Sequence, residues 1–173
     1  MDDSVIRSML KWPDIPDVYG WLQLDRRGNW RLRSESPDPD PPFGTIGNFA
    51  FREFISRNYA ADERGCWYFQ NGPQRVFVRL AYAPHVFHLA DDGLVDHCGL
   101  PAGPFDGAWI DEEGSLVLRT AGRIGLLDDR ELSSLAEQVS EGGVRIGSIT
   151  LPLGAIDSRV MEARFGFVKD PKP

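Results

Sequence analysis

One eight-residue motif occurs three times in this 173-residue chain and limits what it can fold into. The motif reads Asp, two residues that are each Arg or Glu, Gly, any residue, Trp or Leu, any residue, and Leu or Phe. Its copies begin at Asp25, Asp62 and Asp111. Aspartate bonds the backbone ahead of it, and glycine tolerates the positive φ that closes a tight turn. The alternating apolar residues that follow predict a half-buried strand, so each copy predicts a β-hairpin turn.

The charge balance narrows the classes of partner. The formal net charge is −7, which argues against bulk binding of a nucleic-acid backbone, because that needs a basic surface. The net charge does not exclude a local arginine pocket that binds a small anion. Lysine occurs only at Lys11, Lys169 and Lys172, and arginine favours bidentate contacts with carboxylate or phosphate. The arginine excess is also what a GC-rich genome produces.

The location is expected to be cytoplasmic. There is no run of eighteen apolar residues, so we expect no membrane span. The acidic start at Met1–Ser4 differs from a secretory signal, which begins with basic residues. Cys66 and Cys98 give no disulfide framework.

Hydrophobic periodicity predicts the elements of the first half of the chain. Helical spacing predicts helices over residues 3–11 and 46–59. Proline keeps 36–42 out of a sheet. Turn signals are expected at Asn71-Gly72 and at 91–93. Alternating patterns predict strands over residues 19–24, 29–33, 66–70, 75–82 and 85–89.

The second half repeats the order of hairpin, helix and strands. Asp128 followed by Glu131 forms a capping-box pattern that opens a helix. Leu132, Leu135, Ala136 and Val139 form its expected apolar stripe, and Gly142-Gly143 is expected to end it. Strands are predicted over 144–153, with a bulge or break near Gly147, and over 160–168.

This order predicts an α+β fold of duplicated hairpin, helix and strand units, with mainly antiparallel sheets that each pack on one helix. We expect a lead-in over residues 1–18, a first domain over 19–98, a linker over 99–106 and a second domain over 107–173. The first and third motifs lie 86 residues apart, about half the chain.

Residues Gly65–Val78, followed by Ala83–Phe87, resemble a bacterial family of unknown function. Members of that family carry a similar tryptophan hairpin, a helix, a strand with paired aromatic residues and a valine-rich strand that ends in Ala-Pro-Phe. The resemblance covers about residues 19–140. It implies a duplicated domain, a second domain like a pleckstrin-homology fold, and a nucleotide-type ligand in a cleft between the domains. Ala81–Ala83 and Asn71–Gln74 depart from the family pattern.

Residue types that carry catalysis or bind metals are present without a matching pattern. His85 and His88, three apart on a strand, face opposite sides and cannot ligate one metal from an unbroken strand. Cys66 reads best as a strand residue rather than a nucleophile. The carboxylates at 111–113 and 128–129 are accounted for by a turn and a helix cap. We therefore expect no metal, no cofactor and no catalytic site, and an enzyme with an unrecognised site remains a third possibility.

The remaining candidate for function is an arginine-rich sheet face. Arginine forks beside aromatic rings can hold a phosphorylated or nucleotide-like ligand. The alternative is an ordinary solvated face, on which arginine stems cover apolar surface. The side chains expected to share the face are Arg31, Arg33, Arg75, Arg79, Tyr68 and Phe77.

Three functions follow in order of preference. The first is a non-enzymatic protein that binds a small anionic or nucleotide-like ligand near the domain interface, in signalling or regulation. The second is a protein-interaction or self-associating module, in which the chain could form a homo-oligomer. Its support is the number of aromatic residues on hairpins, since exposed aromatic residues are common at interfaces. The tryptophans are Trp12, Trp21, Trp30, Trp67 and Trp109. The third is the enzyme mentioned above.

Overall fold

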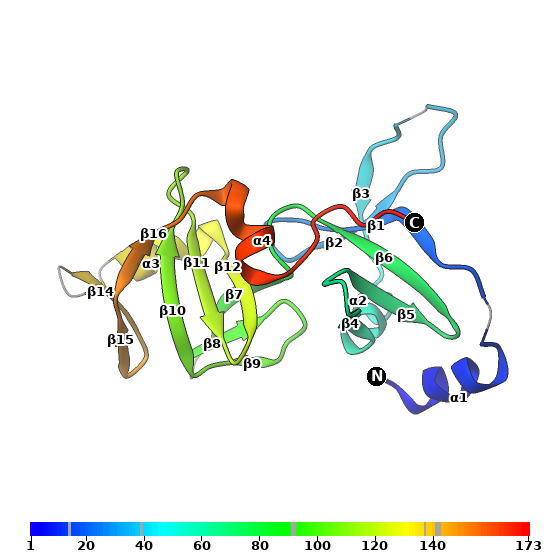
Figure 1. The fold of residues 1–173 in the computed structure, drawn as a ribbon, viewed down its shortest axis with the longest axis horizontal. Helices are drawn as coiled ribbons and strands as arrows, with labels where there is room; N and C mark the ends of the chain where they lie inside the picture. Colours follow the sequence, from blue (N-terminus) through cyan, green and yellow to red (C-terminus); the bar gives the residue numbers. More distant parts are fainter. Residues whose placement is uncertain (14, 39, 91–92, 137, 141–142) are drawn as a thin grey trace. The chain divides into compact units, whose positions relative to one another are not determined.

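A computed structural model describes residues 1–13, 15–38, 40–90, 93–136, 138–140 and 143–173. The chain divides into two compact units (Figure 1). Unit 1 comprises residues 1–25, 29–81 and 166–173, and unit 2 comprises residues 26–28 and 82–165. Each unit is built around its own mixed sheet, so the fold is α+β as the sequence predicts.

Unit 1 is a six-stranded sheet in the order β3-β2-β1-β6-β5-β4. Strands β1 and β6 pair in parallel, and the other neighbouring strands of this order pair antiparallel. Two helices, α1 (Asp3–Lys11) and α2 (Phe49–Arg57), belong to the unit. The strands are β1 (Val18–Leu24), β2 (Trp30–Arg33), β3 (Phe43–Thr45), β4 (Tyr59–Ala61), β5 (Trp67–Asn71) and β6 (Gln74–Leu80).

Helix α2 packs on one face of this sheet. Phe54 and Phe51 meet Phe69 of β5 edge-on, with ring centroids 5.4 and 6.2 Å apart. The helix is shorter than the predicted 46–59 because capping residues bound it on both sides. The Asn48 side chain accepts a hydrogen bond from the Phe51 N–H, and the Asn58 side chain donates to the Phe54 carbonyl.

Unit 2 is a seven-stranded sheet in the order β16-β10-β11-β12-β7-β8-β9, with a separate sheet β13-β14-β15. Its strands are β7 (His85–Ala90), β8 (Gly93–Asp96), β9 (Pro101–Ala102), β10 (Phe105–Ile110), β11 (Leu116–Thr120), β12 (Arg123–Leu127), β13 (Val139–Ser140), β14 (Gly143–Ile146), β15 (Ile149–Leu151) and β16 (Leu153–Ala155). Its helices are η1 (Asp129–Glu131), α3 (Leu132–Ala136), η2 (Ser158–Val160) and α4 (Met161–Phe165).

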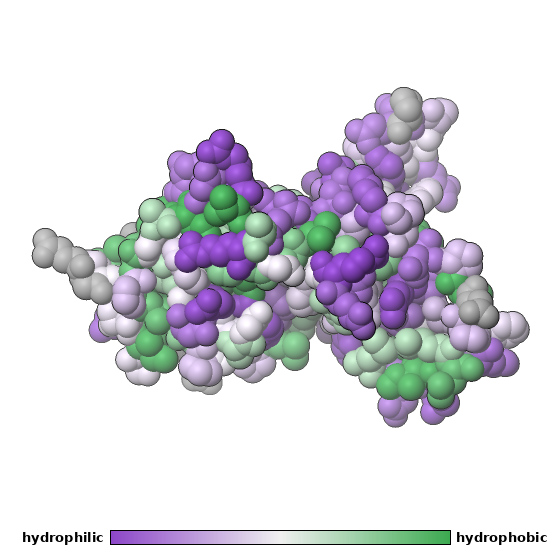
Figure 2. Space-filling model, viewed as in Figure 1, coloured by the Kyte–Doolittle hydropathy of each residue, from purple (hydrophilic) through white to green (hydrophobic). Residues whose placement is uncertain are grey.

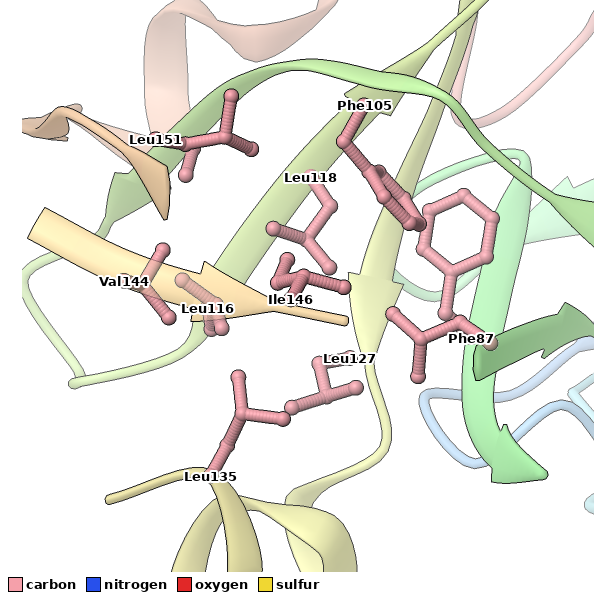
Figure 3. Packing of buried hydrophobic residues seen from close by; sticks show 11 residues of the cluster. Phe87, Phe105, Leu116, Leu118, Leu127, Leu135, Val144, Ile146 and Leu151 are labelled. Carbon is pink, nitrogen blue, oxygen red and sulfur yellow. The ribbon is translucent and has the colours of Figure 1, made fainter. Parts of the chain in front are cut away.

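The core of unit 2 lies between the large sheet on one side and α3 with the small sheet on the other. Leu116 and Leu118 of β11 meet Val144 and Ile146 of β14, and Leu135 of α3 closes the same interior (Figure 3). These residues therefore join the two sheets and the helix in one packed layer.

The two units share a strand order. In unit 1, the first strand pairs antiparallel with the second and parallel with the last, β6. In unit 2, β10 does the same with β11 and β16. Strands β7–β9 extend the sheet of unit 2 through a parallel pairing of β7 with β12. Strands β7 and β8, which precede the expected linker at 99–106, thus lie in the same compact unit as β10.

The Asp–Gly turn forms at every predicted copy. Gly28, Gly65 and Gly114 have φ of 78°, 78° and 83°. In each turn the aspartate carboxylate accepts the N–H of the residue four positions later, at 2.9, 2.8 and 2.7 Å. A further turn of this kind, which the motif did not predict, begins at Asp96. Its carboxylate accepts from the N–H groups of Cys98 and Leu100, on either side of Gly99, which has φ of 78°.

Two predictions about the second half were wrong. The predicted strand over 160–168 is η2 followed by α4, because Asp157 caps the turn by accepting from the Arg159 N–H. The predicted helical stripe ended at Val139, which lies instead in β13. Asp128 does cap this helical segment, since its carboxylate accepts from the Arg130 N–H at the start of η1, which continues into α3.

The break predicted near Gly147 is confirmed as the tight turn between β14 and β15, where Ile146 pairs with Ile149. The turn expected at 91–93 and the helix end expected at 142–143 fall partly outside the described residues. No helix in the described ranges is long and apolar enough to cross a membrane.

Candidate functional site

The strand registers of unit 1 show which of the predicted face residues lie on neighbouring strands. Gln23 of β1 pairs with Arg31 on one side and with Arg79 on the other. On the next strands, Phe77 pairs with Tyr68 and Arg75 pairs with Gln70. Because side chains alternate along a strand, these residues and Arg33 project from the face opposite the one that α2 covers.

The two aromatic residues of the face lie in the core rather than on an open surface. Phe77 is 1 % exposed and stacks on Tyr19, with ring centroids 4.5 Å apart and an interplanar angle of 3°. Tyr68 is also buried, and Val168 of the C-terminal segment packs against the same cluster. One face of the Phe77 ring is therefore already covered by Tyr19.

Three of the four predicted arginines have partners within unit 1. Arg31 donates to the Phe43 carbonyl. Arg33 pairs with Asp40. Arg79 lies 3.9 Å from the Asp170 carboxylate (Nε to Oδ1). Arg33 and Arg79 therefore have carboxylate partners, whereas Arg31 has a neutral one.

Arg75 differs from Arg33 and Arg79 in having no carboxylate beside it, and from Arg31 in lining two hollows. Its guanidinium lies over the Tyr68 ring, 4.8 Å from the centroid. Within the described ranges, no carboxylate lies within 4.0 Å of it. Arg75 also lines two hollows of unit 1, described next. Among the predicted arginines, Arg75 therefore combines the lack of a nearby carboxylate in the described residues with a position at the wall of these hollows.

The smaller hollow, of about 420 Å³, contains a second arginine. Arg64 pairs with Asp62 at 3.1 Å, and hydrogen bonds with Tyr19 and Asp62 raise the pKa of Arg64. Burial works against ionisation of Asp62, but hydrogen bonds from Cys66 and Arg64 lower its pKa all the same. Within this turn, the Asp62 carboxylate thus largely balances the positive charge of Arg64. The hollow is lined by Ala61, Asp62, Glu63, Arg64, Tyr68 and Arg75.

The larger hollow, which we call the Arg75 cleft, has a volume of about 750 Å³. Gln70 lies in its wall and is 1 % exposed. The Gln70 Nε2 donates to the Gly72 carbonyl at 2.9 Å, whereas its Oε1 is buried without a hydrogen-bond partner. The cleft is lined by Met9, Leu10, Pro13, Ile15, Pro16, Asp17, Gln70, Pro73 and Arg75.

Sequence reasoning missed Gln70. The alternating pattern of β5 places it on the same face as Tyr68, but a glutamine at the end of a strand is ordinarily an exposed residue. Its partnerless oxygen arises from the tertiary structure, so no local pattern could have indicated it.

The polar residues of unit 2 form a paired network instead. The Asp96 carboxylate, 2 % exposed, lies 2.8 Å from Arg123 and 3.4 Å from His85. Burial opposes the ionisation of Asp96, but hydrogen bonds from His85 and the Leu100 N–H lower its pKa. Among residues whose placement is described, no group of three or more His, Cys, Asp or Glu could hold a metal ion.

His88 and Asp128 form a second part of this network. The His88 Nδ1 lies 3.2 Å from the fully buried Asp128 carboxylate, which also pairs with Arg130. Burial raises the pKa of Asp128, but hydrogen bonds from Arg130 outweigh it and hold the pKa at about 2. Burial and the neighbouring His85 lower the pKa of His97 to about 3. These groups support the fold of unit 2.

The comparisons with known proteins fit this picture. A family model described as a protein of unknown function (DUF2946) matches residues 1–172. The chain belongs to this family. The description of this family assigns no activity. No curated protein matches the chain significantly.

Two solved structures are similar in fold. A DUF1285 family protein from Silicibacter pomeroyi is 20% identical, with a TM-score of 0.53, over 81% of this chain and 83% of that chain. A DUF1285 family protein from Shewanella baltica is 13% identical, with a TM-score of 0.44, over 67% of this chain and 90% of that chain. The first similarity shows a shared fold for the DUF2946 chain.

Proposed function

We propose that unit 1 binds a small anionic ligand through Arg75. The observation that carries the proposal is a guanidinium held over Tyr68 at the wall of two hollows, with no carboxylate of the described residues within 4.0 Å. Such a guanidinium offers a planar fork of donors that matches a carboxylate or a phosphate. A cation–π contact with the Tyr68 ring stabilises the Arg75 guanidinium in this position, so keeping it without a carboxylate partner costs little free energy.

The proposal gives the other predicted residues smaller parts. Tyr68 positions the guanidinium, and Phe77 contributes to the core beneath it. Arg31, Arg33 and Arg79 add positive charge to the same face, although each already has a partner. A nucleotide-like ligand remains within the proposal, but its base would have to stack elsewhere than on Phe77. A role in signalling or regulation stays a prediction.

A thermal-shift panel of inorganic phosphate, a nucleoside monophosphate and N-acetyl amino acids tests the proposal. Ligand binding to the folded state should raise the melting temperature as the concentration exceeds Kd. Arg75→Ala should weaken binding about tenfold to a hundredfold, since a hydrogen bond to a charged group contributes about 1.5–3 kcal/mol. Arg75→Lys should recover only part of the loss, because the ammonium lacks the fork.

Arg79→Ala is the matched control, because Arg79 lies on the same strand and face but already has Asp170 beside it. It should leave the shift nearly unchanged. No shift at millimolar concentrations of any ligand in the panel, or an equal shift in Arg75→Ala, would contradict the proposal.

A second function, self-association or protein interaction, is favoured by a different observation. Leu10 is 81% exposed and Trp12 is 54% exposed, and Figure 2 shows apolar side chains gathered over α1. Trp21 is also largely exposed, whereas Trp30 is buried. Light scattering across a concentration series tests this function, and a monomer at every concentration that binds no apolar dye would count against it.

A further inference from the structure

The charged end of Arg75 lies at the smaller hollow. Its guanidinium is 4.8 Å from the centroid of the Tyr68 ring, and Tyr68 lines this hollow, whereas the described residues that line the Arg75 cleft do not include it. Tyr68 and Arg75 are diagonal neighbours on β5 and β6, which brings the two side chains together on one face of the sheet. The guanidinium is therefore available to a ligand in the smaller hollow.

The formal charges of the residues that line the smaller hollow sum to zero. Two are arginines, Arg64 and Arg75, and two are carboxylates, Asp62 and Glu63. Asp62 and Arg64 pair with each other at 3.1 Å. Neither Arg75 nor Glu63 has an ion-pair partner within 4.0 Å among the described residues. Within the described part of the chain, the hollow thus presents one unpaired charge of each sign.

These two charges are too far apart to neutralise each other directly. Glu63 is exposed in the Asp62 turn, and Arg75 is half-buried on β6. Both line the same hollow, yet no ion pair within 4.0 Å forms between them. The hollow volume of about 420 Å³ lies near the lower end of the roughly 300–1,000 Å³ typical of small-molecule sites. A small molecule can therefore lie between the two charges and contact both.

The balance of charge disfavours other classes of ligand. A phosphate monoester carries about −1.5 to −2 charges at pH 7, so it would add excess negative charge beside Glu63. A simple carboxylate would leave Glu63 unpaired, and a simple amine would leave Arg75 unpaired. A ligand with one carboxylate and one ammonium group pairs with both and keeps the sum of charges at zero.

We propose that the smaller hollow binds a small zwitterion of the amino-acid type. Its carboxylate binds the planar fork of Arg75, and its ammonium binds the Glu63 carboxylate. Two sources share this chemistry: a free α-amino acid, and a dipeptide, whose charged ends lie farther apart. The inference rests on the proposed function, since the carboxylate is the anionic group that Arg75 binds.

The first test compares three ligands on the unaltered protein. Isothermal titration at pH 7 uses L-alanine, L-lactate, which has a hydroxyl in place of the ammonium, and L-alanine amide, which lacks the carboxylate. We expect L-lactate to bind about threefold to tenfold more weakly than L-alanine, because an exposed ion pair contributes modestly. L-alanine amide should bind about tenfold to a hundredfold more weakly, because the Arg75 fork loses its partner.

Two variants then assign each preference to a residue. Glu63→Gln removes a charge at an exposed turn position. It should abolish the preference for L-alanine over L-lactate and keep the preference for L-alanine over its amide. Arg75→Ala should abolish the preference over the amide. Glu53→Gln is the matched control, because Glu53 is an exposed carboxylate on α2 of unit 1 and does not line the hollow. It should change neither preference.

L-alanyl-L-alanine distinguishes the two sources. Tighter binding of this dipeptide than of L-alanine indicates a short peptide, and tighter binding of L-alanine indicates a free amino acid. Either result supports the inference if Glu63→Gln weakens the tighter ligand, and overturns it if Glu63→Gln has no effect.

The outcomes separate the inference from the proposed function. If phosphate raises the melting temperature through Arg75 but L-alanine and L-lactate bind equally or not at all, the inference is overturned and the proposed function stands. The same holds if Glu63→Gln leaves the preference for L-alanine over L-lactate intact. If no ligand binds, both fail.

Discussion

Units 1 and 2 share a strand order, but particular arginines of the two units have different surroundings. In unit 2, Arg123 and Arg130 pair with Asp96 and Asp128, both almost fully buried. In unit 1, Arg75 lies over an aromatic ring and at the wall of a cleft. Arg123 and Arg130 therefore neutralise buried carboxylates, whereas Arg75 has no carboxylate partner among the described residues. A duplicated architecture need not duplicate a site.

The difference comes from the strands and turns that carry the charges. The buried aspartates of unit 2 either form a turn or cap a helix. Backbone N–H groups therefore hold their carboxylates in place in addition to the arginines. Arg75 follows the Gly72 turn, and the residue across from it is the neutral Gln70. Four experiments can break or sharpen this comparison.

The largest effect is expected from Asp96→Ala in unit 2. The change removes the acceptor of two turn N–H groups and leaves Arg123 without its carboxylate. Breaking a buried ion pair costs about 3–5 kcal/mol. Denaturant unfolding measures the loss, and hydrogen exchange should place it in unit 2. Asp106→Ala, which breaks the exposed pair with Arg119 in the same unit, should cost less than about 1 kcal/mol; equal costs would refute the contrast.

Two glycines of the same turn motif should respond differently to alanine. A Cβ on Gly65 would lie 2.2 Å from the Gly166 carbonyl oxygen, whereas one on Gly114 meets nothing within 4 Å. Both have positive φ, which costs a non-glycine residue about 1–2 kcal/mol. Gly65→Ala should cost about 3 kcal/mol or more, because backbone must also shift. Similar melting temperatures for the two variants would show that the contact with Gly166 is not maintained.

Acid should weaken unit 2 through His97. The folded-state pKa of about 3 lies below the ordinary value of 6.5, so the unfolded chain binds a proton first as pH falls. Stability is full above pH 6.5 and declines as pH falls toward 3. His97→Gln, which keeps an acceptor for the Val86 N–H, should flatten the dependence between pH 6.5 and 4.5. An unchanged slope in denaturant midpoints would exclude His97 as the cause.

The smallest effect on stability is expected at Arg75. Arg75→Ala removes a cation–π contact and no ion pair among the described residues, so unfolding should change by less than about 1 kcal/mol. Arg123→Ala, which leaves Asp96 buried without its guanidinium, should cost several times more. If Arg75→Ala proved equally costly, Arg75 would be structural and the contrast between the units would fail.

The sequence predicted the hairpins because turn chemistry is local. Aspartate, glycine and alternating apolar residues decide the turns at Asp25, Asp62 and Asp111 within a few positions. The turn at Asp96 was missed because His97 and Cys98 stand where the motif has Arg or Glu, and Pro101 stands where it has Trp or Leu. Residues 160–168 were assigned to a strand by their apolar content, although Met161 and Phe165 stand at helical spacing after the capping Asp157.

The candidate site was predicted only in part, for a similar reason. Alternation along one strand put Arg75, Phe77 and Arg79 on one face, but only the parallel pairing of β1 with β6 decides which strands are neighbours. Whether an arginine finds a carboxylate depends on distant segments, as Asp170 does for Arg79. Gln70 became a candidate only once its environment was known.

The path of the chain through unit 1 has a consequence for its synthesis. Residues 166–173 complete this unit: the Val168 N–H donates to the Gly65 carbonyl at 3.0 Å, and the Leu80 N–H donates to the Lys169 carbonyl at 2.7 Å. All of residues 82–165 are translated before this segment. A ribosome adds about 5–20 residues per second, so for several seconds the nascent sheet holds Phe77 and Cys66 without Val168 over them. Unit 1 therefore begins to be synthesised before unit 2, but its last segment is added only after unit 2 is complete.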